Sequence, residues 1–105
     1  MATFTERERA FENKFQRDAE MRFRADMRRA RLLGAWAALQ MALPPDQRDT
    51  YAGQLVRAHF DHHDEGWLLD RVHEDLVARG RTVSRHRIER QAGRLLAIAR
   101  AEIAT

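Results

Sequence analysis

The 105-residue sequence contains no cysteine. This absence excludes disulfides, thiolate catalysis and cysteine-based zinc sites, and it is compatible with a reducing compartment. No stretch approaches the roughly 20 apolar residues that a membrane-spanning helix requires. The N-terminus carries charges where a signal peptide would have an apolar run. We therefore expect a cytoplasmic protein that does not insert into a membrane.

Glycine and proline are also scarce, with five and two copies. Pro44 and Pro45 form the clearest break, because proline lacks an amide donor and disfavours helix at the residue before it. Gly66 and Gly80 mark two further breaks. No window shows sustained alternation of period two, and no internal repeat is present. These breaks leave four periodic stretches after an N-terminal extension.

Each stretch has apolar residues at helical spacing, which predicts one buried face per helix. The helices are expected at about residues 23–41, 46–60, 64–80 and 84–103, with Ser84 as an N-cap and Gly80 as a left-handed C-cap. The expected inward residues are Phe23, Met27, Ala30, Leu32, Leu33, Gly34, Trp36, Ala37, Leu39 and Met41, then Tyr51, Ala52, Leu55, Val56, His59 and Phe60, then Trp67, Leu68, Leu69, Val72, Leu76 and Val77, and finally Ile88, Ala92, Leu95, Leu96, Ala99 and Ile103.

The predicted fold class is all-α, with residues 21–105 as a four-helix bundle and residues 1–20 as a flexible or marginally helical extension. In the extension, Thr5 and Glu8 fit a capping box, and Phe4, Phe11 and Phe15 fall on one narrow line of a helix. Burying one phenylalanine contributes about 1.5–3 kcal/mol, whereas ordering each residue's backbone costs about 1–2 kcal/mol. We therefore expect this segment to be disordered or frayed when free, and helical when a partner covers the phenylalanines.

The net charge is +3, yet the 16 acidic residues are interspersed with the 19 basic ones, of which only Lys14 is lysine. This mixture favours a solvated surface over a nucleic-acid interface. The most basic stretch is interpreted as the solvated face of the first bundle helix, with an acidic protein or a polyanion as alternatives; it contains Arg22, Arg24, Arg28, Arg29 and Arg31. A protein partner is preferred because no aromatic stacking platform is interleaved there.

No catalytic constellation is evident. His59 and His63 lie at i,i+4 spacing with His62 nearby, so a metal-dependent enzyme is one alternative. A packed neutral imidazole on the apolar face is the preferred interpretation of His59. The acidic pairs Glu6/Glu8, Asp61/Asp64 and Glu74/Asp75 lack the apolar surroundings that suit acid–base chemistry. We expect neither an enzyme nor a metal site.

Several blocks in order resemble a known family. The chain carries FENKF (residues 11–15) where the family has an FExKF box, and RFRA (residues 22–25) where it has RFKA. The most specific block is RRARLLGAWAA (residues 28–38), which resembles RRNKLLGLWAA. Residues 51–60 resemble a YAxxVVRADF segment, and SRHRI (residues 84–88) with LLA (residues 95–97) is similar to the last helix. The chain thus resembles the zeta subunit family, the ATPase inhibitor of alphaproteobacterial F-type ATP synthases.

This resemblance implies a four-helix bundle with an inhibitory N-terminus that inserts between alpha and beta subunits of the synthase head, against the rotor, and blocks ATP hydrolysis. By position, the inhibitory region spans about residues 3–17. Its amphipathicity suggests the contact residues Thr3, Phe4, Arg7, Arg9, Phe11, Lys14 and Phe15. The family's structural motif would comprise Phe23, Leu32, Leu33, Gly34, Trp36, Tyr51 and Phe60.

The expected partner is therefore the catalytic head, with its alpha, beta and rotor subunits, of a membrane-bound ATP synthase. The chain is expected to be a monomer when free and to lie outside the membrane when it is bound to the synthase. No cofactor is expected. Weak adenine nucleotide binding is associated with the family, although nothing in this sequence marks such a site. The alternative function is a small, basic, helical nucleic-acid-binding module.

Overall fold

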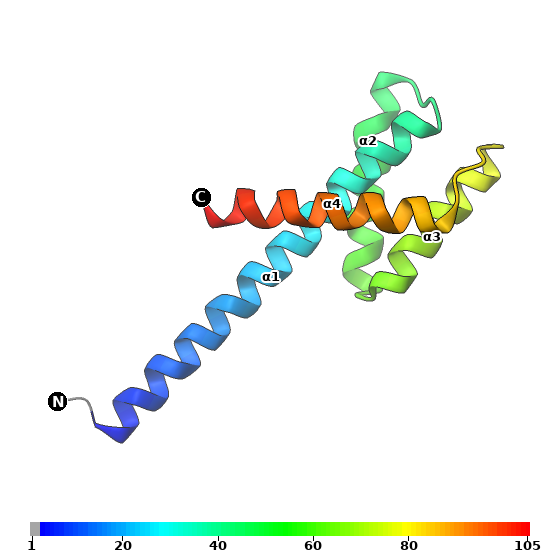
Figure 1. Cartoon of the computed structure of the whole chain (residues 1–105). Coiled ribbons are helices and arrows are strands. Elements are labelled where there is room, and N and C mark those ends of the chain that lie inside the picture. The colour runs from blue at the N-terminus through cyan, green and yellow to red at the C-terminus, as the bar shows by residue number, and fades with distance from the viewer. Residues whose placement is uncertain (1–2) are drawn as a thin grey trace.

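A computed structural model describes residues 3–105, and these form four helices and no strand (Figure 1). The helices are α1 (Phe4–Gln40), α2 (Pro45–Asp61), α3 (Glu65–Ala78) and α4 (Arg85–Ala104). The second half of α1 packs with the other three helices, while its first half projects away from them. The predicted all-α bundle is confirmed. The N-terminal segment continues the first bundle helix without a break at residue 20.

The start of α1 lies earlier than predicted. Thr3 is the N-cap, and its hydroxyl accepts the amide N–H of Glu6 at 3.2 Å. The Glu6 carboxylate in turn accepts the N–H of Thr3 at 2.9 Å. The prediction that Thr5 and Glu8 form the capping box is wrong, because the same pattern occurs two residues earlier. Capping at Thr3 brings Phe4 into the helix and leaves Thr5 within its first turn.

The other helix ends follow local chemistry. Asp64 and Ser84 cap α3 and α4 by accepting the amides of Trp67 and Arg87. After α3, Gly80 has the predicted positive φ of 72°, which lets the N–H of Arg81 return to the carbonyl of Leu76 at 3.0 Å.

The turn after α1 uses the same geometry without glycine. Ala42 has a φ of 55°, and the N–H of Leu43 reaches the carbonyl of Ala38 at 3.0 Å. Alanine rarely adopts this conformation, so it could not be predicted from the residue type. Two residues later, α2 begins at Pro45, where a missing amide hydrogen costs no helical hydrogen bond.

The core forms where α1 lies between α2 and α4, with α3 packed mainly against α4. The buried face of α1 is rich in small residues, which lets neighbouring helices approach closely on two sides; these are Ala25, Ala30, Gly34, Ala37 and Ala38. Larger side chains fill the space between the helices, and the fully buried ones are Leu33, His59, Leu68, Val72, Leu76 and Ile88.

At Gly34, the backbone of α1 lies close against α2. A Cβ atom at this position would lie 2.8 Å from the Cα of Ala52 and 3.3 Å from a methyl group of Leu55. The first of these is a backbone atom of α2, so it could not move without displacing the helix. Glycine at position 34 therefore permits the close packing of α1 against α2.

Four residues that were expected to face the core are exposed instead. Phe60, Leu39, Val77 and Phe23 expose 61%, 58%, 56% and 40% of their surface. Leu39 and Val77 lie beside the stripes that α2 and α4 cover, so the predicted apolar faces were too wide. Phe23 and Phe60 pack edge to face on each other, with ring centroids 6.0 Å apart, outside the core.

None of the helices in the described range carries an apolar run sufficient to cross a bilayer.

We predict that Gly34→Ala destabilises the protein by about 1–3 kcal/mol, because the added methyl group must push α1 and α2 apart. The matched control is Gly93→Ala on α4, where a Cβ would meet nothing within 4 Å. That control should stabilise the fold by about 0.5–1 kcal/mol through its helix propensity. Urea unfolding of both variants measures the difference, and equal effects would contradict the close contact.

Candidate functional site

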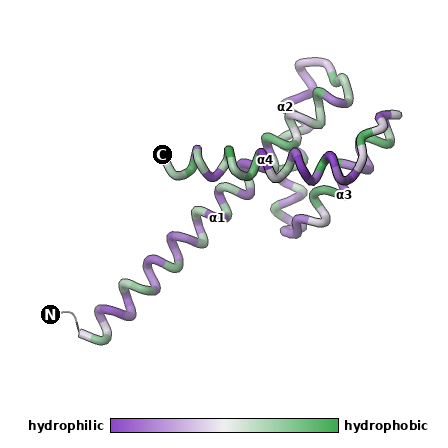
Figure 2. Tube along the Cα trace, viewed as in Figure 1, coloured by the Kyte–Doolittle hydropathy of each residue, from purple (hydrophilic) through white to green (hydrophobic). Residues whose placement is uncertain are grey.

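The first part of α1, residues 4–20, has no packing partner and is called the arm below. Every residue of the arm is exposed, and the first residue of α1 that is fully buried is Ala25. Figure 2 shows the arm as a largely hydrophilic helix with isolated apolar positions. The 64 Å longest dimension of the molecule, against 26 and 23 Å for the others, reflects this projection. The arm is therefore a surface presented to solvent.

Three phenylalanines form one stripe along the arm. Phe4, Phe11 and Phe15 fall within about 40° of one another at roughly 100° per residue, so they share one face of the helix. They expose 77%, 71% and 63% of their surface. Aromatic side chains are among the most common anchors of protein interfaces. A row of three such side chains is a surface that a partner can cover.

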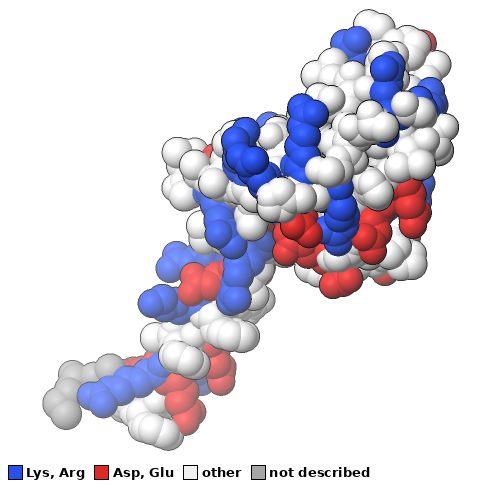
Figure 3. Space-filling model, turned by 45° about the vertical axis from the view of Figure 1, so that its right-hand side comes forward, with Lys and Arg blue, Asp and Glu red and all other residues white. Residues whose placement is uncertain are grey.

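Charged groups occupy the rest of the arm. Arg7, Arg9 and Lys14 are exposed, and within residues 3–105 they form no ion pair. Figure 3 shows acidic and basic side chains interspersed on the side of the arm that is in view. A mixed surface of this kind suits a protein partner better than a polyanion.

A cleft lies at the root of the arm, where α1 meets the end of α4 and the link between α2 and α3. Its volume is about 480 Å³, and it is lined by Phe15, Ala19, Arg22, Phe23, Asp26, His63, Leu96 and Arg100. The apolar stripe of the arm thus runs from Phe4 to the edge of this cleft.

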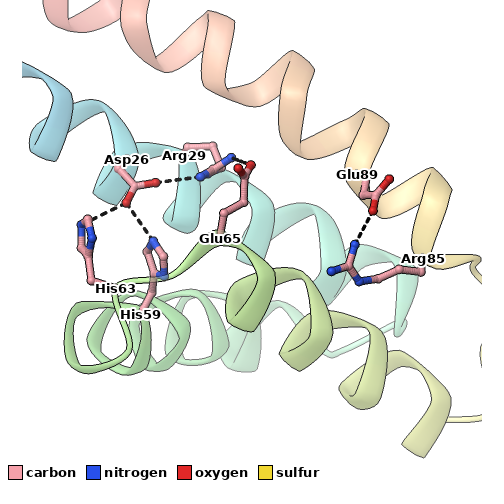
Figure 4. Close-up of polar contacts among 7 residues, drawn as sticks. All are labelled: Asp26, Arg29, His59, His63, Glu65, Arg85 and Glu89. Carbon is pink, nitrogen blue, oxygen red and sulfur yellow. Dashed lines mark hydrogen bonds and ion pairs between the residues drawn. The ribbon is translucent and has the colours of Figure 1, made fainter.

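Beside the cleft, a polar cluster joins α1, α2 and α3 (Figure 4). Asp26 lies at its centre. One carboxylate oxygen, Oδ1, accepts a hydrogen bond from the guanidinium of Arg29 at 2.7 Å. The other, Oδ2, lies 2.9 Å from Nε2 of His59 and 3.2 Å from Nε2 of His63. Arg29 also donates to Glu65 at 3.0 Å. The cluster therefore connects α1, near the root of the arm, to α2 and to α3.

Burial and charge act in opposite directions on Asp26. Burial raises the pKa of its carboxyl group, but hydrogen bonds and charge from His59 and Arg29 more than offset this and lower the pKa from 3.8 to about 2. Because the folded pKa lies below the unfolded one, the ionised carboxylate stabilises the fold above about pH 4. That contribution is lost as the pH falls through about 2.

The sequence did not predict this cluster. Arg29 was expected on a solvated face, but it is only 3% exposed, so that expectation is wrong. The available signal was that Asp26 and Arg29 share the helical stripe of Ala30 and Leu33, which is an unusual place for charge. The predicted burial of His59 is confirmed at 1% exposure, although its Nε2 faces a carboxylate.

The three neighbouring histidines do not form one group. His63 stacks on His59 with ring centroids 5.3 Å apart, so both face Asp26. His62 instead stacks on Trp67 at 4.6 Å. The alternative metal site of His59, His62 and His63 is therefore wrong as predicted, because His62 points away from the other two histidines. The third side chain beside His59 and His63 is Asp26.

The remaining motif residues have structural positions. Leu33 and Gly34 are buried, whereas Leu32, Trp36 and Tyr51 are partly buried against the core. The hydroxyl of Tyr51 donates to the Asp75 carboxylate at 2.8 Å. Burial and this neighbouring carboxylate raise the pKa of Tyr51, so its hydroxyl stays protonated.

A family model described as ATPase inhibitor subunit zeta matches residues 1–102. The chain belongs to this family. A comparison with curated proteins and one with solved structures find no match. An inhibitor subunit is a regulatory rather than a catalytic component, and its partner is an ATP synthase. Zeta-family membership therefore favours the inhibitor over a nucleic-acid-binding module.

For this zeta-family chain we predict that Asp26→Asn destabilises the fold by about 3 kcal/mol, because the buried Arg29 loses its shorter ion pair. The control is Glu65→Gln, which removes the other carboxylate bonded to Arg29. The Glu65 side chain is 61% exposed, so its loss should cost less than about 1 kcal/mol. Urea unfolding at pH 7 compares them, and equal losses would show that Asp26 is not the dominant partner.

Proposed function

We propose that this protein inhibits ATP hydrolysis by an F-type ATP synthase, and that the arm is the inhibitory element. In this proposal the arm inserts at an interface between the alpha and beta subunits of the catalytic head and against the rotor. Phe4, Phe11 and Phe15 would be its apolar anchors, and Arg7, Arg9 and Lys14 would provide charge contacts. The body, residues 25–105, would remain outside and hold the arm in place.

The observation that carries this proposal is the exposed phenylalanine stripe on the arm, the part of α1 in which every residue is exposed. Each of these side chains would gain about 1.5–3 kcal/mol on full burial, so a partner with an apolar groove could hold the arm. The body needs no such partner, because its own core buries its apolar side chains. Inhibition and folding thus depend on different residues.

The arm also has chemistry suited to helix-in-groove recognition, in which an amphipathic helix lays one face into a partner. Its capping box stabilises the free helix end, and its phenylalanines lie on one face over about three turns. Burial against a partner would supply the stabilisation that the isolated arm lacks.

Deleting residues 1–19 should abolish inhibition of ATP hydrolysis by the cognate synthase head and leave the body folded. The deleted segment contains the phenylalanine stripe and no buried residue among those described. The assay is the steady-state hydrolysis rate of the head with increasing amounts of full-length or truncated protein, with circular dichroism to confirm folding. A truncated form that inhibits as strongly as the full chain would contradict the proposed function.

The single change Phe11→Ala should weaken inhibition by about 30-fold, the effect of losing one interface anchor worth about 2 kcal/mol. It should leave the free energy of unfolding within about 0.5 kcal/mol of the parent, because Phe11 contacts no core residue. Asn13→Ala is the matched control, since Asn13 points to the opposite side of the same helix turn. If both variants inhibit equally, the stripe is not the contact surface.

A further inference from the structure

We propose that Asp26, His59 and His63 bind one divalent transition-metal ion of the Zn²⁺ class at the root of the arm. The inference does not depend on the proposed inhibition. It rests on three donor atoms from separate parts of the chain that already converge: Oδ2 of Asp26 from α1, Nε2 of His59 from α2, and Nε2 of His63 from the link that precedes α3. All three donor atoms lie within 4.8 Å of one another.

The spacing suits tetrahedral coordination. Ligand atoms that each lie about 2.1 Å from a tetrahedral zinc ion are separated by about 3.4 Å. Oδ2 of Asp26 is 2.9 Å from Nε2 of His59 and 3.2 Å from Nε2 of His63, so both distances are within a few tenths of an ångström of this separation. The two imidazole nitrogens lie within 4.8 Å of each other, and a shift of the exposed His63 ring would set their spacing around an ion. One carboxylate and two imidazoles form a donor set that Zn²⁺ and its neighbours in the first transition row prefer.

The surroundings hold the carboxylate ligand in place. The other oxygen of Asp26, Oδ1, is bonded to Arg29 at 2.7 Å, and Arg29 is itself held by Glu65. Outer partners of this kind orient ligating carboxylates in metal sites. The imidazole of His59 is fixed by burial, and that of His63 lies between the rings of His59 and Phe23. Two of the ligands are thus preorganised, and the third is confined by stacking.

Access to the site comes from the cleft at the root of the arm, which is lined by Asp26 and His63. The His63 side chain is 52% exposed, so an ion can enter, and a fourth coordination position can open toward the cleft. The ion would connect α1 directly to α2 and to the link before α3. Its effect would be to fix the angle at which the arm leaves the body.

The experiment is titration of the full-length, untagged protein with ZnCl₂ by isothermal calorimetry, with His63→Ala as the test variant. His63 is exposed and lies outside the helices, so its removal should leave the fold intact, as circular dichroism would check. We expect one ion per chain for the parent and a loss of affinity exceeding about 10-fold for the variant, the scale on which even outer partners act. His62→Ala is the control and should bind like the parent.

A second measurement tests coordination directly. Bound Co²⁺ should give the visible absorption of a tetrahedral site in the parent and in His62→Ala, and not in His63→Ala or Asp26→Asn. Zn²⁺ at a concentration that saturates the parent should raise the melting temperature of the parent more than that of His63→Ala. The proposal is overturned if the parent shows no saturable event, if His63→Ala binds like the parent, or if His62→Ala loses binding to the same extent.

Discussion

The fold depends on the unequal distribution of apolar surface along a single helix. From Ala25 onward α1 presents small and branched residues at helical spacing, and α2 and α4 pack against it. Before that point it offers a few separated apolar residues, mainly phenylalanines, among charges. Because α2 must approach within contact of Gly34, the bundle forms around one particular segment of α1. The arm is left outside because no other helix reaches it.

The composition and periodicity of the sequence predicted much of this architecture. The four helical stretches and the caps at Ser84 and Gly80 depend on interactions between residues close in sequence, which a single sequence reveals. The start of α1 was misplaced because two overlapping segments satisfy the same capping pattern. The turn at Ala42 could not be predicted, since tertiary packing imposes a conformation that alanine seldom adopts.

The candidate sites differ in how far the sequence could reveal them. The phenylalanine stripe is a local pattern, and its exposure follows from having too little apolar area to pack. The cluster around Asp26 is not local: it brings together residues 26, 29, 59, 63 and 65 from three helices and a link. Spacing alone suggested His62 as a companion of His59 and His63. Only the folded chain shows that the ring of His62 turns toward Trp67.

Burial of the Asp26–Arg29 ion pair costs desolvation free energy that an apolar core would not. Replacing a buried ion pair by hydrophobic residues is often neutral or stabilising, so such pairs are weak evidence for stability alone. In this chain the pair lies where the arm leaves the body, and Nδ1 of His59 has no hydrogen-bond partner among the described residues. Polar groups at this junction fix the direction in which the arm leaves the body, because hydrogen bonds have preferred angles that hydrophobic contacts lack.

Because α1 continues without a break from the arm into the body, the arm moves as one rigid rod when α1 tilts at its root. At about 1.5 Å per residue, its tip at Phe4 lies about 32 Å from Ala25, so a tilt of about 10° at the root would displace the tip by roughly 5 Å. That is one helical turn, the distance over which an aromatic anchor would exchange one pocket for the next. A small torque on the body would thus be amplified at the far end.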